Sequence, residues 1–530
     1  MTLHRQRRPV AILPTVRDVV LDLLRDNGMT TIFGNPGSTE LPMFRDFPAD
    51  FRYILGLQEL IVVGMADGFA QATRRPVLVN LHSSAGVGHA LGNIFTAYRN
   101  YTPLVITAGQ QARSILPFQP FLFAEAAADF PKPFVKYSVE PARAADVPLA
   151  IARAIRVAMT PPCGPVFVSV PVDDWDQPSA PIAIRRVSRD VSGDAVSLAE
   201  AAEALAAARA PALVVGAGIA RDDCWDEVIA LAERHDAAVW AAPFNARNSF
   251  PEDHPLFAGF LPAARPGIVA ALEPHDLVVV LGGPLSLYHT ESDGPHLPER
   301  TRAILLTDDP ALASYAPVGD AIVSSMRPAL AALQAGPTPV RRAAPPPRPA
   351  PPAIDPAVLT DTLLMTRIAA LRPADAIVVE EAPTTRGPMH DYLPILIRDG
   401  FYTCASGGLG HALPAAIGVA LGKPGTRIIA LLGDGSSMYA IQGLWSAAQL
   451  KLPITFVIVK NRRYQALVEF GHVFGLQQTV GTELPDIDFC TLASAQGVSA
   501  QTVDSPGALD AALQAAFEGD GPNLVEVCIV

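Results

Sequence analysis

The sequence has few cysteines, no long apolar run and no block of basic residues, and each absence excludes a class of protein. Its five cysteines are scattered without a CxxC pair, so we expect neither a thiolate zinc site nor a disulfide framework. No apolar stretch approaches the roughly 18 residues that a membrane helix needs. Acidic side chains outnumber basic ones and the net charge is -12, which does not suit nucleic-acid binding. We therefore expect a cytoplasmic protein that binds a small or anionic metabolite, without contact to a membrane.

The N-terminus contains paired arginines, but the apolar run that follows them is short. Pro14, Arg17 and Asp18 interrupt this run before it reaches the length of a signal peptide. We therefore expect no export signal.

A proline-rich stretch, 337–356, divides the chain. It reads PTPVRRAAPPPRPAPPAIDP, and prolines without amide donors favour extended geometry over a packed core. Half of the 530 residues are apolar, which allows two to four compact domains. We predict four segments, namely an N-terminal domain (1–185), a central domain (190–335), a linker (336–356) and a C-terminal domain (357–530).

Short apolar runs that end in Gly, Ser, His or Asp alternate with helical patterns along the whole chain. PVLVNLH at 76–82 and PLVITAG at 103–109 are examples, and similar runs begin near 211, 275, 302, 376, 427 and 453. This alternation is typical of parallel sheets flanked by helices. We predict an α/β fold with three consecutive domains of this kind, and a helix that begins at Glu59 and ends near Arg74.

The most specific chemical pattern lies in the C-terminal domain. Gly433, Asp434, Gly435 and Ser436 end one apolar strand, and Asn461 ends the next. Adjacent parallel strands deliver their carboxyl ends to the same edge, so Asp434 and Asn461 should meet there. Hard oxygen ligands suit Mg²⁺ or Ca²⁺, and the glycines let backbone amides approach a diphosphate.

The sequence resembles the thiamin-diphosphate enzymes of the pyruvate decarboxylase and acetolactate synthase type, and within them most closely the benzoylformate decarboxylases. The GDG pattern with its distant asparagine is the first point of similarity. The segments FGNPGSTELP, LQE and NLHS lie in the order of that family, as do TAGQQAR and GGLGHALPAAIGVAL. The similarity is collinear from about residue 30 to the end and is weaker in the central domain and the linker.

The resemblance implies a role for each matching residue. Glu59 would bond to N1′ of the aminopyrimidine, Ser38 would hold the substrate carboxylate, and His82 and His289 would handle protons. The cofactor would be bound by Asn35, Gly37, Glu59, Thr384, Gly407, Leu409, Gly433, Asp434, Gly435, Ser436, Asn461 and Tyr464. The metal ion would be bound by Asp434, Asn461 and the Arg463 carbonyl. The substrate pocket would contain Ser38, Phe121, Leu122, Thr403, Ala466, Leu467 and Phe470.

The implied reaction is the non-oxidative decarboxylation of a 2-keto acid with an aryl or bulky group, giving an aldehyde and CO₂. The family also implies a homotetramer built from homodimers, with active sites between subunits. Two alternatives stay open. One is a carboligase or lyase resembling acetolactate synthase or benzaldehyde lyase, and the other is a non-catalytic thiamin-diphosphate binder that acts as a scaffold or sensor.

The sequence departs from the pattern of this family at three places. Lys460 replaces the first asparagine of the usual pair and brings a charge near the metal ligands. Thr403 stands where benzoylformate decarboxylases have an aromatic residue, and the segment from Glu381 to Thr384 differs from their hydroxyl-rich segment. In the central domain, GAG at 216–218 is too slight a pattern to indicate flavin, and a sheet-to-helix turn explains it better.

Overall fold

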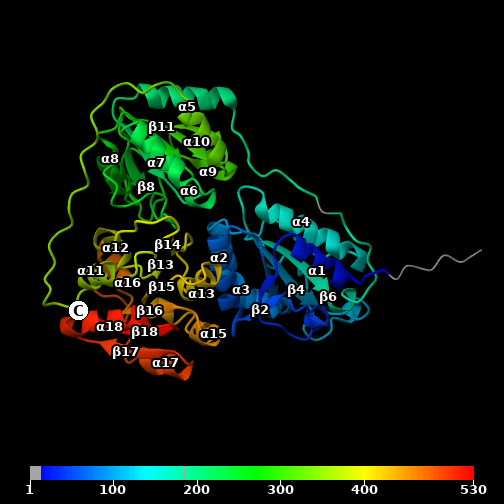
Figure 1. Cartoon of the computed structure of the whole chain (residues 1–530). Coiled ribbons are helices and arrows are strands. Elements are labelled where there is room, and N and C mark those ends of the chain that lie inside the picture. The colour runs from blue at the N-terminus through cyan, green and yellow to red at the C-terminus, as the bar shows by residue number, and fades with distance from the viewer. Residues whose placement is uncertain (1–12, 184, 530) are drawn as a thin grey trace, which may run out of the picture.

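A computed structural model describes residues 13–183 and 185–529 (Figure 1). The paired arginines of the N-terminus lie within 1–12, outside the described residues, whereas Arg17 and Asp18 belong to the first helix. The described chain forms three six-stranded sheets, and the strands within each sheet pair in parallel. Helices cover the sheets, which confirms the predicted α/β class.

The first sheet has the strand order β2-β1-β3-β4-β6-β5. Its strands are β1 (Thr31–Gly34), β2 (Arg52–Leu55), β3 (Val77–Leu81), β4 (Leu104–Gln110), β5 (Ser138–Val139) and β6 (Val166–Pro171), and its helices are α1 (Val16–Asp26), α2 (Glu59–Thr73), α3 (Ser83–Arg99) and α4 (Val147–Met159). The helix predicted from Glu59 is therefore confirmed as α2.

The central sheet has the order β12-β11-β10-β7-β8-β9, and apolar clusters pack on both of its faces. Its strands are β7 (Pro211–Val215), β8 (Ala238–Ala241), β9 (Phe257–Phe260), β10 (Leu277–Leu281), β11 (Arg302–Thr307) and β12 (Asp320–Val323). Its helices are α5 (Ala195–Ala207), α6 (Gly218–Arg221), α7 (Trp225–Arg234), α8 (Arg265–Leu272), α9 (Pro310–Tyr315) and α10 (Met326–Gln334).

The third sheet, β14-β13-β15-β16-β18-β17, repeats the strand order of the first. Its strands are β13 (Ile377–Glu381), β14 (Phe401–Thr403), β15 (Ile428–Gly433), β16 (Ile454–Lys460), β17 (Ser499–Val503) and β18 (Asn523–Cys528). Its helices are α11 (Asp361–Leu371), α12 (Arg386–Tyr392), α13 (Ala412–Gly422), α14 (Asp434–Ser437), α15 (Gly443–Leu450), α16 (Gln465–Val473), α17 (Phe489–Ala495) and α18 (Pro506–Glu518).

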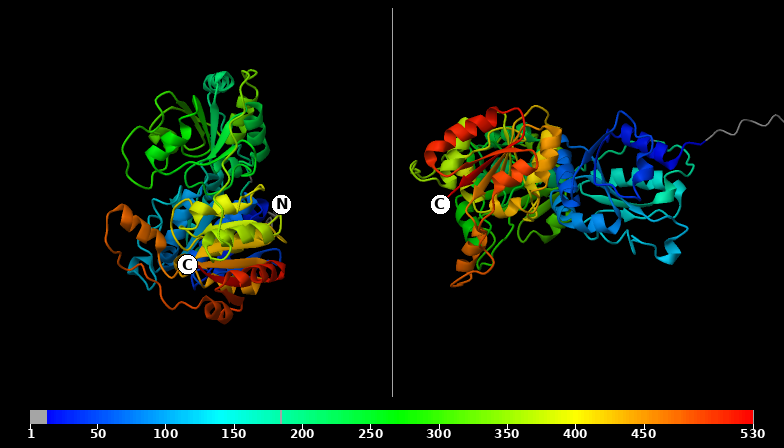
Figure 2. Two further views of the ribbon diagram at one scale, coloured as in Figure 1. Left: turned by 90° about the vertical axis from the view of Figure 1, so that its left-hand side faces the viewer. Right: turned by 90° about the horizontal axis from the view of Figure 1, so that it is seen from below.

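The first and third sheets share one apolar core, because α2, α3 and α13 lie between them (Figures 1 and 2). Glycines allow α2 and α13 to approach closely. A β-carbon on Gly68 would lie 2.2 Å from the Ala415 carbonyl oxygen, and one on Gly418 would lie 1.9 Å from the Met65 carbonyl oxygen. The helix that begins at Glu59 is thus packed backbone to backbone against the C-terminal domain.

The segment between α10 and α11 crosses the outside of the molecule without a described helix or strand (Figure 1). Two of its arginines attach it. Arg342 donates to the backbone carbonyls of Ala206 and His235, and Arg348 forms an ion pair with Asp391. The proline-rich segment is therefore an extended strap.

Two predicted absences can be compared with the described residues. None of the helices in the described part of the chain is long and apolar enough to cross a membrane. The five cysteines are free thiols in this structure.

Candidate active site

Glu59 is the first residue of α2, but another side chain accepts the amides at the start of the helix. Gln58 caps α2 instead, because its side-chain oxygen accepts the amides of Leu60 and Ile61. Glu59 is only 8% exposed, and Asn35 and His89 approach its two oxygens at 3.4 and 3.1 Å. A capping role is thereby excluded, and the carboxylate stays available to a ligand.

His82 follows β3, and Glu40 holds its ring. Nδ1 of His82 lies 2.8 Å from Oε2 of Glu40, whose side chain is almost fully buried. Glu40 also accepts the amides of Gly37 and Gly109 and the Thr39 hydroxyl, so it is fixed in place. Because a carboxylate accepts hydrogen bonds, we assign the ring proton to Nδ1, which leaves Nε2 without this partner. Glu40, which is not among the predicted site residues, thus orients the predicted site residue His82.

Close packing explains Gly37, and the other residues of its loop lie nearby. A β-carbon on Gly37 would lie 2.1 Å from Nδ1 of His82, so only glycine allows the ring to sit there. Asn35 and Ser38 belong to the same loop, and the Ser38 side chain is exposed. Because β1, β2 and β3 are parallel, this loop, Glu59 and His82 all lie at one edge of the first sheet.

Asp434 and Asn461 meet at the corresponding edge of the third sheet, as predicted. The Asp434 carboxylate is 4% exposed and accepts backbone amides of Gly435, Asn461 and Arg462. Burial raises the pKa of Asp434 above its ordinary value, and within the described residues no arginine or lysine forms an ion pair with it. Asn461 accepts the Arg463 amide at 3.1 Å. A buried carboxylate without a cationic partner, beside further oxygen donors, fits a divalent cation.

Lys460 does not point at this metal position. Its ammonium forms an ion pair with the buried Glu526 and bonds to the Ile487 carbonyl, on the side of β16 covered by α17. The charge of Lys460 lowers the pKa of Asp434 less than the three backbone hydrogen bonds do. The unusual lysine is therefore a partner of Glu526 within the domain.

The turn after β15 is packed so closely that it requires a glycine. A β-carbon on Gly435 would lie 2.3 Å from the ring of Tyr464, so these two predicted residues are in direct contact. The Ser436 hydroxyl donates to the carbonyls of Glu381 and Gly433 and ties the ends of β13 and β15 together. Thr384 lies half-buried between β13 and α12. Backbone amides of a glycine-containing turn of this kind are suited to binding phosphate oxygens.

The loop that connects β14 to α13 carries Gly407 and Leu409. Gly407 has a φ of +72° and nothing within 4 Å of its β-carbon position, so one side of the loop is open. Asn93 of α3 donates to the Gly410 carbonyl, and Thr96 bonds to Ser406. The predicted cofactor loop is therefore attached to the first domain.

Three predicted substrate residues come from two domains, His289 from the central domain and Thr403 and Phe470 from the third. His289 of the central domain lies 4.6 Å, ring to ring, from Phe470 of α16. The Thr403 hydroxyl donates to Glu380, and its amide bonds to the central domain at the Ala246 carbonyl. The structure thus brings His289 and Phe470 together, as predicted for one pocket.

Other predicted pocket residues stay on the surface of this single chain. Phe121 is 87% exposed and Leu467 is 53% exposed, whereas Leu122 and Ala466 are half-buried. No hydrogen bond or ion pair in the described parts of the chain joins the group around Glu59 to the group around Asp434. The described chain thus carries two groups of predicted site residues without a direct bond between them, the Glu59 half-site and the Asp434 half-site.

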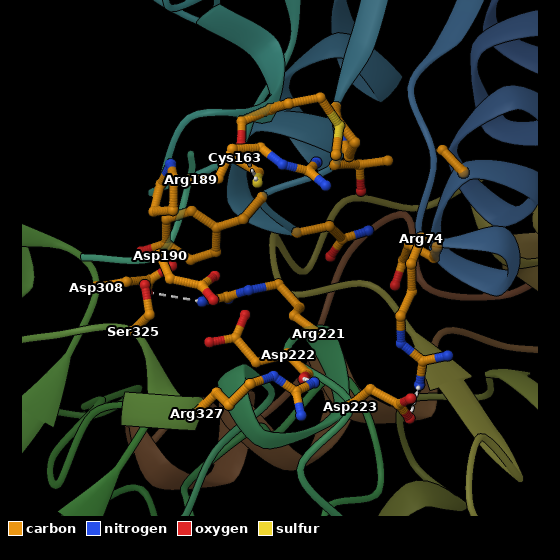
Figure 3. A pocket seen from close by; sticks show the side chains of 18 of the residues that line it. Arg74, Cys163, Arg189, Asp190, Arg221, Asp222, Asp223, Asp308, Ser325 and Arg327 are labelled. Carbon is orange, nitrogen blue, oxygen red and sulfur yellow. Dashed lines mark hydrogen bonds and ion pairs between the residues drawn. The ribbon is translucent and has the colours of Figure 1, made fainter. Parts of the chain in front are cut away.

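A charged cavity lies apart from both half-sites, between the first and central domains (Figure 3). It measures about 270 Å³, and the side chains of Arg221, Asp222 and Asp308 face one another in it, with Arg221 and Asp308 paired at 2.9 Å. None of the predicted site residues lines it.

The glycines of the GAG segment serve the turn after β7. A β-carbon on Gly216 would lie 2.4 Å from the α-carbon of Gly283, and one on Gly218 would lie 2.7 Å from that of Gly282. The segment forms the turn from β7 to α6, in line with the predicted sheet-to-helix turn, and its close packing against a second loop requires both glycines.

Three family models match the chain, each within one of the three sheets' segments. The thiamine pyrophosphate enzyme N-terminal TPP binding domain matches residues 14–127, the central domain matches 198–333, and the C-terminal TPP binding domain matches 387–527. Together they cover more than half of the chain.

Individual relatives extend over nearly its full length. Benzoylformate decarboxylase of Pseudomonas aeruginosa is 42% identical over 522 residues, which cover 97% of this chain and 99% of the relative. The crystal structure of benzoylformate decarboxylase from Polynucleobacter necessarius is 39% identical, with a TM-score of 0.95 over 98% of this chain and 99% of that chain. The 4-hydroxybenzoylformate decarboxylase of Rhodococcus jostii RHA1 is 39% identical, with a TM-score of 0.93 over 97% and 99%. The chain belongs to the thiamine pyrophosphate enzyme family.

Proposed function

We propose that this protein is a thiamin-diphosphate-dependent decarboxylase that converts a benzoylformate-like 2-keto acid to an aldehyde and CO₂. The observation that carries the proposal is a pair of buried carboxylates at two sheet edges. The Glu59 carboxylate does not cap its helix, and the Asp434 carboxylate forms no ion pair with an arginine or lysine of the described residues. The 42% identity to a benzoylformate decarboxylase over nearly the whole chain supports the same reaction. Carboligase and scaffold functions are not favoured.

Bound thiamin diphosphate supplies a nucleophilic carbon and an electron sink for the loss of CO₂. Glu59 exchanges a proton with the aminopyrimidine ring at its N1′ atom, and Asn35 lies beside the same carboxylate. Gly407 and Leu409 would contact the ring from the loop before α13. These assignments follow the family resemblance and the placement of each residue.

Asp434, Asn461 and the backbone carbonyl of Arg463 hold Mg²⁺ or Ca²⁺ in this proposal. Gly433, Gly435, Ser436, Thr384 and Tyr464 surround the diphosphate. A bound divalent cation would balance the charge of the Asp434 carboxylate, which burial disfavours.

Ser38 binds the substrate carboxylate, and two histidines move protons on the substrate side. Nε2 of His82 is directed by the Glu40 contact at Nδ1, and His289 comes from the central domain. The aryl group packs against apolar residues of the pocket named above, which excludes water from the reacting atoms. Thr403 is smaller than the aromatic residue of the family, and it is buried and bonded to Glu380.

A second copy of the chain completes each site in this proposal. Large apolar side chains near both half-sites are strongly exposed, which is unusual for a surface that stays in water. They are Phe118, Phe121, Leu467, Val473, Phe474, Leu476 and Val480. We therefore propose a dimer with the first domain of one copy against the third domain of the other, assembled into a tetramer. Light scattering of the purified protein should give two or four chains, and a monomer with full activity would contradict this arrangement.

The domain limits 1–185, 190–335 and 357–530, and the cytoplasmic location, stay predictions from the sequence. The reaction is tested by a panel of aryl, branched and short 2-keto acids, with and without thiamin diphosphate and Mg²⁺. We expect aldehyde and CO₂ in equal amounts from benzoylformate and little product from pyruvate. Exclusive formation of acetolactate or an acyloin would favour the carboligase alternative, and no CO₂ from any acid would favour the scaffold.

A further inference from the structure

A buried carboxylate holds the end of the loop that carries Gly407 and Leu409. Glu381 is the last residue of β13 and is 4% exposed. Its Oε1 accepts the Gly410 amide at 2.6 Å, and its Oε2 accepts the amides of His411 and Ala412 at 2.8 and 2.7 Å. These amides belong to the start of α13, where a helix leaves its N–H groups without internal partners. One side chain from the neighbouring strand thus satisfies three of them.

The loop depends on such anchors because its own backbone is permissive. Gly407 and Gly410 both have positive φ, and the former has open space around it. His411, directly after the loop, is fully buried, and its side chain bonds to the buried Asp67 of α2. The loop end is therefore held twice, through its backbone by Glu381 and through the His411 side chain by the helix that begins with Glu59.

Stability alone does not explain a charged group at this position. Burial raises the pKa of Glu381 to about 7, although the three amides and His411 act in the opposite direction. Keeping this carboxyl ionised in the folded protein is therefore costly. A serine or threonine within the loop would cap α13 without burying a charge. Costly ionisable groups of this kind are concentrated at functional sites.

We propose that Glu381 is a positioning residue that holds loop 407–410 in the conformation in which Gly407 and Leu409 meet thiamin diphosphate. The contact between Glu381 and the loop stands on the hydrogen bonds alone. Only its consequence for the cofactor rests on the proposed function. Glu381 touches neither substrate nor cofactor in this assignment, and it acts through the loop backbone.

The contact is tested by Glu381→Gln in the full chain without cofactor. The amide side chain keeps the size of glutamate but loses the charge that strengthens the three bonds. We expect amide hydrogen exchange in peptides covering 405–413 to accelerate about tenfold or more, because bonds to charged groups contribute more than a factor of ten each. The matched control is Glu380→Gln. Glu380 is equally buried on the same strand, but it bonds to Thr403 and the Ala382 amide and not to the loop, so exchange there should stay as in the wild type.

The consequence is tested by the affinity for thiamin diphosphate and by the kinetics of the same variant. We expect Glu381→Gln to weaken cofactor binding about tenfold to a hundredfold by calorimetry, and to lower kcat at saturating cofactor while the KM for the keto acid changes little. A residue that only stabilises the fold would leave both values unchanged in the folded protein.

A second variant keeps the proposal testable if the first one does not fold. Glu381→Asp retains the charge but is one methylene shorter, so it should give an intermediate exchange rate and an intermediate cofactor affinity. Wild-type exchange in 405–413 for both variants would overturn the contact. Faster exchange with unchanged cofactor affinity and kcat would overturn the positioning role. If the wild type binds no thiamin diphosphate, the proposed function fails, and the exchange result still decides whether Glu381 holds the loop.

Discussion

Glu59 and His82 differ from ordinary helix-start residues in what holds their side chains. Gln58 caps α2 and leaves the Glu59 carboxylate to Asn35 and His89, and Glu40 directs the His82 ring. Both arrangements keep one functional atom available while its surroundings are fixed. This is the geometry that proton transfer requires.

Glu59→Gln should abolish proton exchange with the cofactor and cut CO₂ release by about 10²-fold or more, because acid-base groups contribute that much. The amide retains the size of the carboxylate, so the thermal unfolding temperature should stay close to that of the wild type. CO₂ release is measured with saturating thiamin diphosphate and Mg²⁺. Glu200→Gln, an exposed change on α5, is the control and should leave turnover unchanged. Full turnover in Glu59→Gln would refute the assigned role.

Glu40→Gln should release the His82 ring from its fixed orientation. We expect kcat to fall by about 10- to 100-fold, less than or equal to the loss in His82→Ala, since Glu40 acts only through the histidine. Combining Glu40→Gln with His82→Ala should add little to the effect of His82→Ala alone. Independent, multiplying losses in the double variant would contradict this coupling.

The sequence predicted Glu59, His82, Asp434 and Asn461 because each follows a recognisable motif at a strand end. It did not predict the roles of Glu40, His89 and Glu381, because their partners lie far away along the chain. Gly109, for instance, meets Glu40 only after β1 and β4 have taken their places in the sheet. The orientation of Lys460 depended likewise on the distant Glu526.

At the scale of elements, the crossing of α2 and α13 fixes the first domain against the third. Gly68 and Gly418 have no side chains, and a carbonyl group of the facing helix lies where the β-carbon of each would be. The cofactor loop leads directly into α13, and Glu59 begins α2. The relative placement of both functional groups within one chain therefore depends on this contact.

Gly68→Ala should separate α2 from α13 and destabilise the protein. The added β-carbon meets backbone rather than a flexible side chain, so the cost should be about 1–3 kcal/mol, as for overpacked cores. Chemical denaturation measures this difference. Gly507→Ala in α18, where the new β-carbon meets nothing within 4 Å, is the matched control and should be neutral or slightly stabilising. An unchanged denaturation midpoint for Gly68→Ala would show that the contact is not tight.

The sequence predicted the elements with strong apolar runs and missed those without them. β3, β4, β10 and β16 are continuous buried strands and were recognised. Edge strands are short and less buried, as in the two-residue β5, so local composition carries little information about them. Their existence depends on pairing with a strand that is already in the sheet.

At the scale of the whole molecule, Asp399 joins all three domains. It accepts Arg74 of the first domain and Arg247 of the central domain at 2.7 Å each, and Lys423 of the third domain at 3.0 Å. Arg247 is almost fully buried and stacks on Tyr402. Burial by itself raises the pKa of Asp399, but these three cations hold it below its ordinary value.

Asp399→Asn should destabilise the protein by about 3–5 kcal/mol, because it leaves the buried Arg247 without its charged partner. Because the pKa of Asp399 is lowered on folding, its contribution is present above about pH 4, the ordinary range of an aspartate, and is lost as the pH falls below it. The stability difference between wild type and variant should therefore shrink from pH 7 towards pH 3. Urea denaturation over this range measures it, and a difference that grows on acidification would contradict the assignment.

The order of three α/β domains and the proline-rich connection could be predicted from the sequence. The junction at Asp399 could not, because it unites residues from three domains that no local pattern relates. The completion of each site by a second chain depends on contacts between copies, which no pattern within one chain indicates.

Above all, we propose that this chain binds thiamin diphosphate through a divalent cation at Asp434 and Asn461. Calorimetric titration of the purified, cofactor-free protein with thiamin diphosphate, with Mg²⁺ and with chelator, tests it most directly. We predict saturable binding of one cofactor per chain with Mg²⁺ and at least about 10-fold weaker binding without it. No heat of binding in the presence of Mg²⁺ would contradict the account.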